Sequence, residues 1–316
     1  MTRKKLILDV DTGTDDAVAV MLAALHPALE LIACTTVCGN VAVEHCTANT
    51  LAVLDNVGAV GVPVHEGLHR PLVRATTPVP RREGDLAGQI HPARLPVPPS
   101  QRAKAQSGAV EFLIETYRAA SEPITLVPVA PLSNIAACIA LDPGFVKRVP
   151  EIVIMGGAHA LGNVTPSAEF NVWADPEAAA SVFAAGFERI TLVPLDATHR
   201  ALVSRADCDR LAALGTPAGR AAADFIGHRI VVHDEIQRMP TAGTTPVHDA
   251  LAVGSLIDPS LITTRHLHVA VETTGTLTLG RTVIDTHHRG HHKANCHVAF
   301  DADARGFVEL LAATFA

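Results

Sequence analysis

Four aspartates lie within eight residues near the start of the chain: Asp9, Asp11, Asp15 and Asp16, in the segment LILDVDTGTDDAVAV. The apolar residues before them predict a strand and the run after them predicts a helix, so the acids occupy a turn at Gly13. Carboxylates this close repel one another unless a cation lies among them, and hard divalent cations such as Ca²⁺ and Mg²⁺ bind oxygen ligands of this kind. The turn therefore predicts a metal or ligand site.

Helix capping explains part of this cluster in a simpler way. Asp15 or Asp16 could cap the helix and complement its dipole. One acid, or at most two, is enough for that purpose, and capping leaves Asp11 without an explanation. The metal or ligand site is therefore the favoured interpretation.

A polar segment in the middle of the chain could join the site. Asn163, Glu169 and Asn171 offer amides and a carboxylate that suit a polyhydroxylated ligand. Directly after them, Asp175 and Pro176 have the residue types of a helix N-cap and a first helical position, and we assign them only that structural task.

A second polar segment lies near the end of the chain, where His248 and Asp249 precede an apolar helix. An imidazole beside a carboxylate at a helix start suits acid–base or metal chemistry, and it also suits capping. The sequence leaves both interpretations open.

Strand and helix patterns alternate along most of the chain. Strands are predicted at residues 4–10, 29–37, 62–65, 124–129, 151–155 and 189–195, and helices at 15–26, 43–57, 103–119, 132–141 and after residue 175. Strands at 266–271, 277–284 and 297–300 and a terminal helix follow, and residues 68–100 predict a long loop. Such repeated units predict an α/β fold: a Rossmann-like, mostly parallel sheet flanked by helices, with a few additional C-terminal strands, in a single domain over residues 1–316. Ligands of such sheets bind outside the carboxyl ends of the strands, so the polar segments there should converge on one crevice.

Composition excludes several classes of function. The chain of 316 residues is 48% hydrophobic and 18% charged, which supports a large core. A net charge of −7 without a basic run argues against a nucleic-acid partner. No apolar run reaches the roughly 18 residues of a membrane span. Six cysteines without metal-ligand spacing predict free thiols in a reducing cytoplasm, and the N-terminus reads as a core strand rather than a secretion signal.

Taken together, these motifs resemble the nucleoside hydrolase family, the inosine-uridine preferring N-ribohydrolases. The resemblance covers nearly the whole chain, from DVDTGTDDA through TTVCGN, VAPLSNIA, EIVIMGGA, NVTPSAEFN, DPEAA and TPVHDALAV to LTLGRTVIDT and ANCHVAF. It implies an enzyme that hydrolyses the N-glycosidic bond of a ribonucleoside to ribose and free base, and that forms a homodimer or homotetramer.

The resemblance also implies a Ca²⁺ site. Asp11, Asp16 and Asp249 would coordinate the ion, together with the main-chain oxygen of Val129, a position where the family usually has Thr. Asp11 would deprotonate a Ca²⁺-bound water that attacks the sugar, and Asp9 would orient the loop.

The implied substrate contacts surround a ribose. The residues concerned are Asp15 and Asn40 at the 2′- and 3′-hydroxyls, Asn163, Glu169 and Asn171 on the 5′ and 3′ side, and Met155 near the sugar. His248 would protonate the leaving base, since the charge of an imidazole changes near neutrality. General chemistry agrees with these assignments, because nearby acids stabilise the oxocarbenium-like sugar that forms when the bond breaks.

The sequence departs from the family pattern on the base side. A loop of the form HG-x-x-GLxG commonly carries a histidine, and Arg81 stands there in the segment RREGDLAG; His91 is a candidate substitute. Tyrosines are usual before the HD motif, where this chain has Phe225, His228, His233 and Gln237, and Trp173 is expected in the core. The nucleobase preference is therefore not predicted.

Two alternatives remain. One is a non-catalytic or differently specific ribosyl binder or hydrolase with an altered base loop. The other is a haloacid-dehalogenase-like phosphatase with Asp9 as nucleophile and Asp11 as acid, an interpretation that leaves Asp15 and Asp16 unexplained.

Overall fold

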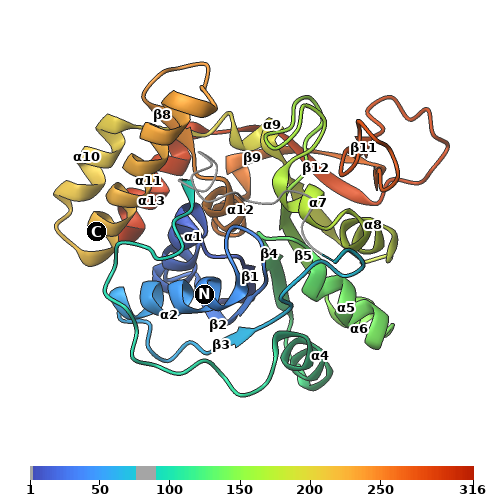
Figure 1. Ribbon diagram of the computed structural model, residues 1–316, viewed down its shortest axis with the longest axis horizontal. Coiled ribbons are helices and arrows are strands. Elements are labelled where there is room, and N and C mark those ends of the chain that lie inside the picture. Colours follow the sequence, from blue (N-terminus) through green and yellow to red (C-terminus); the bar gives the residue numbers. More distant parts are fainter. Residues whose placement is uncertain (1–2, 76–89) are drawn as a thin grey trace.

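An eight-stranded sheet forms the centre of the molecule (Figure 1). The computed structural model describes residues 3–75 and 90–316. In spatial order the strands are β3 (Val64–Glu66), β2 (Leu29–Thr36), β1 (Lys4–Val10), β4 (Ile124–Pro128), β5 (Glu151–Met155), β6 (Ile190–Val193), β12 (Cys296–Ala302) and β9 (Ile262–Leu267). Neighbouring strands are parallel, except that the edge strand β9 is antiparallel to β12. The predicted mostly parallel α/β sheet is confirmed.

Both faces of the central strands are buried, and their side chains alternate between two cores. In β1, Leu6, Leu8 and Val10 belong to one apolar cluster and Ile7 to the other. The helices that contribute to the first cluster are α1 (Thr14–Leu25), α2 (Val43–Asn56), α9 (Leu195–Thr198), α10 (Arg205–Ala213), α11 (Pro217–Ile236), α12 (His248–Ile257) and α13 (Ala304–Phe315). Those of the second are α4 (Ala109–Ala119), α5 (Ser133–Leu141), α6 (Phe145–Arg148), α7 (Phe170–Ala174) and α8 (Pro176–Ala184).

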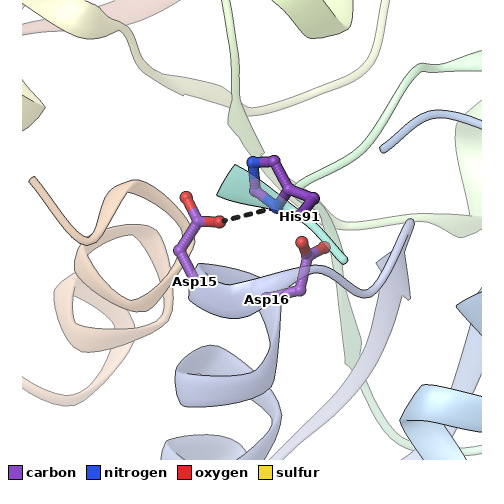
Figure 2. A group of neighbouring side chains, drawn as sticks. All are labelled: Asp15, Asp16 and His91. Carbon is purple, nitrogen blue, oxygen red and sulfur yellow. Dashed lines mark ion pairs between the residues drawn. The ribbon is translucent and has the colours of Figure 1, made fainter. Parts of the chain in front are cut away.

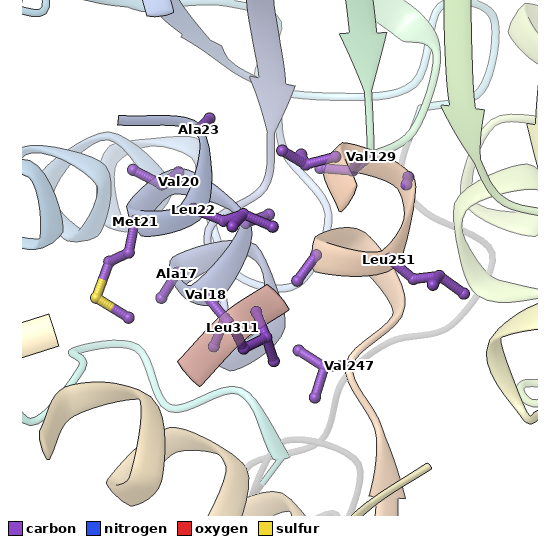
Figure 3. Packing of buried hydrophobic residues seen from close by; sticks show 14 of the residues in the cluster. Ala17, Val18, Val20, Met21, Leu22, Ala23, Val129, Val247, Leu251 and Leu311 are labelled. Atoms are coloured by element: carbon purple, nitrogen blue, oxygen red, sulfur yellow. The ribbon is translucent and has the colours of Figure 1, made fainter. Parts of the chain in front are cut away.

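Helix α1 lies at the centre of the first core. Every residue from Thr14 to Ala23 is buried, and the helix packs against α12 and α13 (Figure 3). Figure 3 shows Leu311 of α13 beside α1. This packing holds the N-terminal ends of α1 and α12 together, although they are far apart in the sequence.

Several sequence predictions need correction at their boundaries. The helix predicted at 103–119 begins only at Ala109, since Gly108 is its N-cap and the main chain of Ser107 contacts His65. The single strand predicted at 266–271 is divided: β9 ends at Leu267 and pairs with β12, whereas β10 (Val269–Val271) pairs with β11 (Thr282–Ile284). Only the end of the strand predicted at 277–284 forms, because Gly280 turns the chain at φ 75°.

Some short elements of the fold have no counterpart among the predicted ones. Strands β7 (Leu202–Ser204) and β8 (Thr244–Pro246) form a separate antiparallel pair, and the short helices α6 and α7 and the 3₁₀ turn Pro259–Leu261 were also not predicted. Among the described residues, no helix combines the length and apolar character needed to cross a lipid bilayer. All six cysteines are unpaired, as predicted, and all six are buried.

The sheet order places a switch point between β1 and β4. The chain runs outward from β1 through β2 to β3, then returns to the other side of β1 with β4. At such a point the connections leave in opposite directions and a crevice opens beyond the carboxyl ends of the two strands. Asp11 follows β1 and Val129 follows β4 at this position.

A buried polar tie fixes the strands beside this crevice. Asn134, on α5, donates to Asp9 Oδ1 at 2.8 Å and to the main-chain oxygen of Thr36 at 2.9 Å, and its own oxygen accepts from Leu68 N at 3.0 Å. Asp9 Oδ1 also accepts from Thr35 Oγ1 at 2.5 Å. The tie joins β1, β2 and α5 directly before the acidic turn. That Asp9 orients this turn stays a prediction.

Loss of this tie should destabilise the fold. The Asn134→Ala substitution removes one hydrogen bond from each of three segments, at Asp9, Thr36 and Leu68, and we expect the free energy of unfolding to fall by about 2–4 kcal/mol. Urea denaturation followed by circular dichroism measures the change. Leu141→Ala is a matched control on the same helix, because Leu141 is 72% exposed; its effect should stay within about 0.5 kcal/mol. Equal effects of the two substitutions would contradict the role of the tie.

Candidate active site

A cavity of about 340 Å³ opens at the switch point, beyond the carboxyl ends of the central strands. All the predicted site residues except Asp11 and Asp16 line it: Asp15, Asn40, Val129, Met155, Asn163, Glu169, Asn171, His248 and Asp249. The remaining lining residues in the described part of the chain are Ile90, His91, Val164, Phe170, Arg229, His233, Ile236 and Gln237. Segments that are distant in sequence therefore converge on one chamber, as expected for strand ends in such a sheet.

Asp16 organises the acidic turn behind the cavity wall. Its Oδ1 accepts from Asp11 N at 3.1 Å, and its Oδ2 accepts from Gly13 N at 2.9 Å and from the Asn40 side chain at 3.0 Å. Asp16 is the third residue of α1 and caps it through Gly13, so the capping interpretation holds for this residue. The same carboxylate also fixes Asn40, which goes beyond what a cap requires.

Asp11 contacts the segment that follows β2. Its Oδ2 accepts from Asn40 N at 2.5 Å. A Cβ on the preceding residue, Gly39, would overlap the Asp11 carboxylate, so the close approach requires glycine. The Cys-Gly-Asn turn is therefore shaped around Asp11.

Burial and mutual repulsion act on the acids together. Burial, followed by the charge of Asp15, raises the pKa of Asp16 to about 7. Burial also raises the pKa of Asp249 well above its usual value, and Asp15, Asp16 and Asp11 add to that rise. The negative charges of the acidic turn therefore repel the Asp249 carboxylate from the other side of the crevice.

The donors at this position suit a hard divalent cation. They are carboxylate oxygens and a main-chain oxygen, that of Val129, and their mutual repulsion is relieved when a cation lies among them. The carbonyl of Val129 accepts from the Asn171 amide at 2.9 Å and retains a second lone pair. Residues Asp15, Asp16 and His91 have ligand atoms within 4.8 Å of one another (Figure 2). This group differs from the predicted set of Asp11, Asp16 and Asp249, with which it shares Asp16.

His91 contacts the start of α1. Thr14 N donates to its Nδ1 at 3.3 Å, and the same nitrogen is 3.9 Å from Asp15 Oδ1. His91 also lines the cavity, so its imidazole lies in the chamber wall beside the start of α1. Arg81, the other residue singled out on the base side, lies outside the described residues.

His248 is the first residue of α12, whose N-cap is Val247. Neither His248 nor Asp249 occupies the N-cap position, so the capping interpretation is wrong for both. Thr198 Oγ1 lies 2.7 Å from His248 Nδ1, and the ring of His199 lies 5.7 Å from the ring of His248. Burial, followed by the charge of Arg229, holds the pKa of His248 well below its usual value. The imidazole is therefore neutral near pH 7, and Thr198 fixes its ring.

The Asn and Glu residues of the middle segment tie the ends of β4 and β5. Asn171 donates to the main-chain oxygens of Val129 and Met155, at 2.9 and 3.2 Å. Asn163 accepts from Phe170 N at 2.9 Å. Glu169 accepts from Asn171 N and Gly157 N and caps α7, and burial raises its pKa to about 7. Glu169 therefore has a structural role that the sequence analysis did not assign, in addition to its place on the cavity wall.

Predictions for the neighbouring residues had mixed outcomes. Asp175 caps α8 and Pro176 is its first residue, as predicted. Trp173 is buried in α7 and is absent from the described cavity lining, as expected for a core residue. Phe225 belongs to the apolar core, whereas His233 and Gln237 line the cavity.

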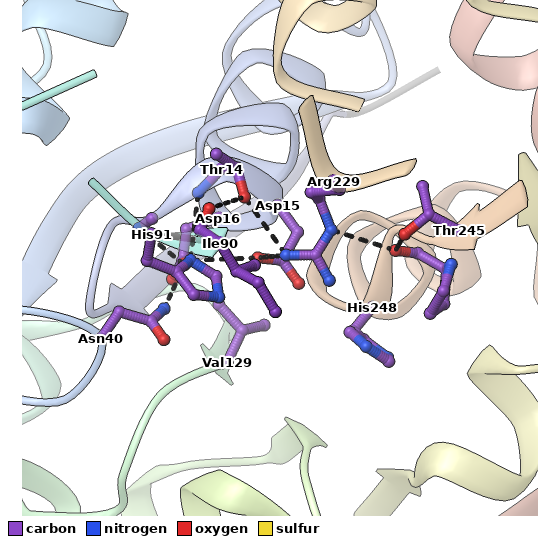
Figure 4. Close-up of polar contacts among 12 residues, drawn as sticks. Thr14, Asp15, Asp16, Asn40, Ile90, His91, Val129, Arg229, Thr245 and His248 are labelled. Carbon is purple, nitrogen blue, oxygen red and sulfur yellow. Dashed lines mark hydrogen bonds and ion pairs between the residues drawn. The ribbon is translucent and has the colours of Figure 1, made fainter. Parts of the chain in front are cut away.

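Arg229 is a site residue that the sequence analysis missed. It is 2% exposed, and its Nη1 is 2.8 Å from Asp15 Oδ1 (Figure 4). One sequence signal was available, since Arg229 follows Phe225 by four residues and precedes Ile230 on the apolar face of a helix. An arginine on such a face needs a buried acid as partner.

Comparison with known proteins agrees with this geometry. The family model described as "Inosine-uridine preferring nucleoside hydrolase" matches residues 6–309. The chain belongs to this family. Because the chain is a member of the nucleoside hydrolase family, the phosphatase alternative has no support.

Named relatives of this nucleoside hydrolase cover almost its full length. The chain is similar to the pyrimidine-specific ribonucleoside hydrolase RihA of Shewanella woodyi, at 39% identity over 99% of this chain and 97% of that one. It is similar to the pyrimidine-specific ribonucleoside hydrolase RihB of Escherichia coli, at 38% identity over 90% and 88%. A solved structure of a purine-preferring ribonucleoside hydrolase from Gardnerella vaginalis superimposes with a TM-score of 0.89 and 32% identity, covering 99% of this chain and 98% of that one.

Divalent cation binding should depend on pH in a defined direction. The pKa of Asp16 is about 7 in the folded protein, above its value in the unfolded chain. The folded protein without a cation therefore binds more protons than the unfolded chain. The contribution of Asp16 to the free energy of unfolding then falls as the pH rises from about 4 to 7. A bound cation requires deprotonated carboxylates and offsets that loss. We expect excess CaCl₂ to raise Tm more at about pH 8 than at about pH 5.5 in differential scanning fluorimetry.

Sodium chloride of equal ionic strength is the control for screening, and Asp249→Asn should reduce the calcium effect. Equal Tm gains at both pH values would contradict a cation held by these carboxylates.

Proposed function

We propose that this protein hydrolyses the N-glycosidic bond of ribonucleosides, with pyrimidine nucleosides as the preferred substrates. The observation that carries the proposal is the chamber itself, where the acids Asp15, Glu169 and Asp249 lie beside amide side chains and imidazoles. Asp11 and Asp16 belong to the acidic turn behind its wall. The names of the two relatives with 38–39% identity support the pyrimidine preference. Among the described lining residues, Phe170 is the only Phe, Tyr or Trp, so a stacked pair of large rings around a purine has little support.

The proposed binding mode places the ribose against the strand ends. Asp15 and Asn40 bind the 2′- and 3′-hydroxyls, while Asn163, Glu169 and Asn171 bind the 5′ and 3′ side, and Met155 packs near the sugar. Hydroxyl donors and acceptors of a ribose match carboxylates and amides in this arrangement. The ring then lies beside the acidic turn, where negative potential favours the oxocarbenium-like transition state.

Ca²⁺ is the proposed cofactor, with Asp11, Asp16, Asp249 and the main-chain oxygen of Val129 as its ligands. When bound, such an ion lowers the pKa of water and orients the ribose diol. In this proposal Asp11 takes the proton of the attacking water. The hydrogen bond that Asn40 N donates to Asp11 Oδ2 fixes the orientation of this carboxylate.

His248 is the proposed partner of the leaving base. Because its pKa is low in the buried site, the neutral ring offers the base an N–H hydrogen bond rather than a full positive charge. In the proposed tautomer, Thr198 Oγ1 donates to Nδ1, 2.7 Å away, and Nε2 carries the proton. The negative charge that develops on the departing base is stabilised by this bond.

The substrate proposal is tested with a panel of nucleosides. We expect free ribose from uridine and cytidine with kcat/KM about 10-fold or more above that for inosine and guanosine, and loss of turnover with a chelator that calcium restores. Faster hydrolysis of the purine nucleosides would contradict the pyrimidine preference. Binding of uridine in calorimetry without release of ribose would favour the ribosyl-binder alternative and contradict hydrolysis.

The role of His248 is tested by substitution. His248→Ala should lower kcat for uridine by about 100-fold or more, because the departing base loses its hydrogen-bond donor. Calcium affinity, measured by calorimetric titration, should stay nearly intact, since the imidazole is not among the proposed ligands. Weakened calcium binding with unchanged kcat would show that the assignment is wrong.

We also propose a cytoplasmic homodimer or homotetramer. Free, buried cysteines are compatible with a reducing compartment.

A further inference from the structure

Arg229 connects the two walls of the chamber. Its Nη1 is 2.8 Å from Asp15 Oδ1 and 3.2 Å from Thr14 Oγ1, and its Nε is 3.3 Å from the main-chain oxygen of Pro246. Figure 4 shows the guanidinium between the start of α1 and the segment that leads to His248. Thr14 and Asp15 precede Asp16, and Pro246 precedes His248 by two residues. One buried side chain thus contacts both segments that carry the site.

The consecutive residues Asp15 and Asp16 have different kinds of partner. The oxygens of Asp16 accept from neutral groups, namely two main-chain N–H groups and the amide of Asn40. One oxygen of Asp15 is paired with the positive charge of Arg229. Both carboxylates are buried. The guanidinium therefore offsets the negative charge of Asp15, whereas the neutral donors leave the charge of Asp16 uncompensated.

We propose that Arg229 is a positioning residue that divides two tasks between these neighbouring acids. It occupies Oδ1 of Asp15 and holds this carboxylate toward the cavity for the substrate hydroxyls. It also keeps Asp15 out of the ligand set of the divalent cation, a task left to Asp16. This inference rests on the proposed function for the identity of the substrate, whereas its cation part can be measured without turnover.

The ion pair predicts opposite effects on the two ligands. Without the guanidinium, Asp15 keeps a buried charge beside Asp16 and Asp249 and lacks its counter-charge. A cation that binds there then gains attraction, and Asp15 turns toward it. Substrate binding loses a preorganised acceptor at the same time. A merely structural loss would weaken both ligands together.

The experiment compares Arg229→Met and Arg229→Lys with the wild-type chain. Calorimetric titration with CaCl₂ should give binding about 10-fold tighter for Arg229→Met, and initial rates with uridine at saturating calcium should give KM raised about 10-fold or more, with a smaller change in kcat. Arg229→Lys keeps the charge without the planar fork, so calcium affinity should return close to wild type while KM recovers in part.

The matched control is Arg238→Met, which removes the same charge from an exposed residue just after the same helix. Its calcium affinity and KM should stay close to wild type. The double variant Asp15→Asn/Arg229→Met lacks both charges, and its calcium affinity should fall back from the value of Arg229→Met toward wild type.

If Arg229→Met fails to fold, Arg229→Gln replaces it, because glutamine can still donate to Thr14 or Pro246, and the same sign of change is expected. Calcium binding that is weaker or unchanged in the folded Met or Gln variant would overturn the proposal. If the wild-type protein releases no ribose from any nucleoside, the proposed function fails by itself, and the calcium titrations still decide the role of Arg229 at the cation site.

Discussion

Like charge in a buried space is the constraint on which this site depends. Asp9, Asp11, Asp15, Asp16 and Asp249 are all buried, and removing several carboxylates from water is unfavourable unless each has partners. The structure supplies three kinds. Neutral donors from Thr35 and Asn134 bind Asp9, main-chain N–H groups and an amide bind Asp16, and a guanidinium binds Asp15. Burial and the neighbouring acids nevertheless raise the pKa of Asp16 to about 7 and that of Asp249 well above its usual value. The remaining negative potential favours a cation, or a positive charge that develops during a reaction, at this place.

The topology explains how the acids are brought together without a long connecting loop. Reversal of strand order between β1 and β4 opens the crevice, and the parallel direction of the strands delivers one polar segment from each carboxyl end. The packing of α1 on α12 then brings Asp249 and His248 to the same place from the last third of the chain. The hydrophobic packing that holds these two helices together therefore sets the electrostatics of the site.

The two sides of the chamber differ in how they are built. Strand ends and main-chain hydrogen bonds form the side assigned to the sugar, where Asn171 ties Val129 to Met155. The side assigned to the base is formed by α11, through His233, Ile236 and Gln237, and by Ile90 and His91. Helix faces and loops can change residues without disturbing the sheet. The names of two relatives differ in the base, pyrimidine-specific in one and purine-preferring in the other, and our proposal places such a difference on this second side.

The sequence by itself determined the fold class and most of the chamber wall. Strong local patterns gave β1 and β5 their observed bounds, and residues placed after strand ends, such as Asn40 and Val129, line the cavity. Short elements such as β7 and β8 were not predicted, because three residues are too few to display a period. Only the tertiary structure decided the pairing of Arg229 with Asp15 and the contact of Thr198 with His248, since each joins residues that lie far apart along the chain. The charge of a side chain follows from the sequence alone. The partner that stabilises the charge when it is buried depends on how distant helices pack.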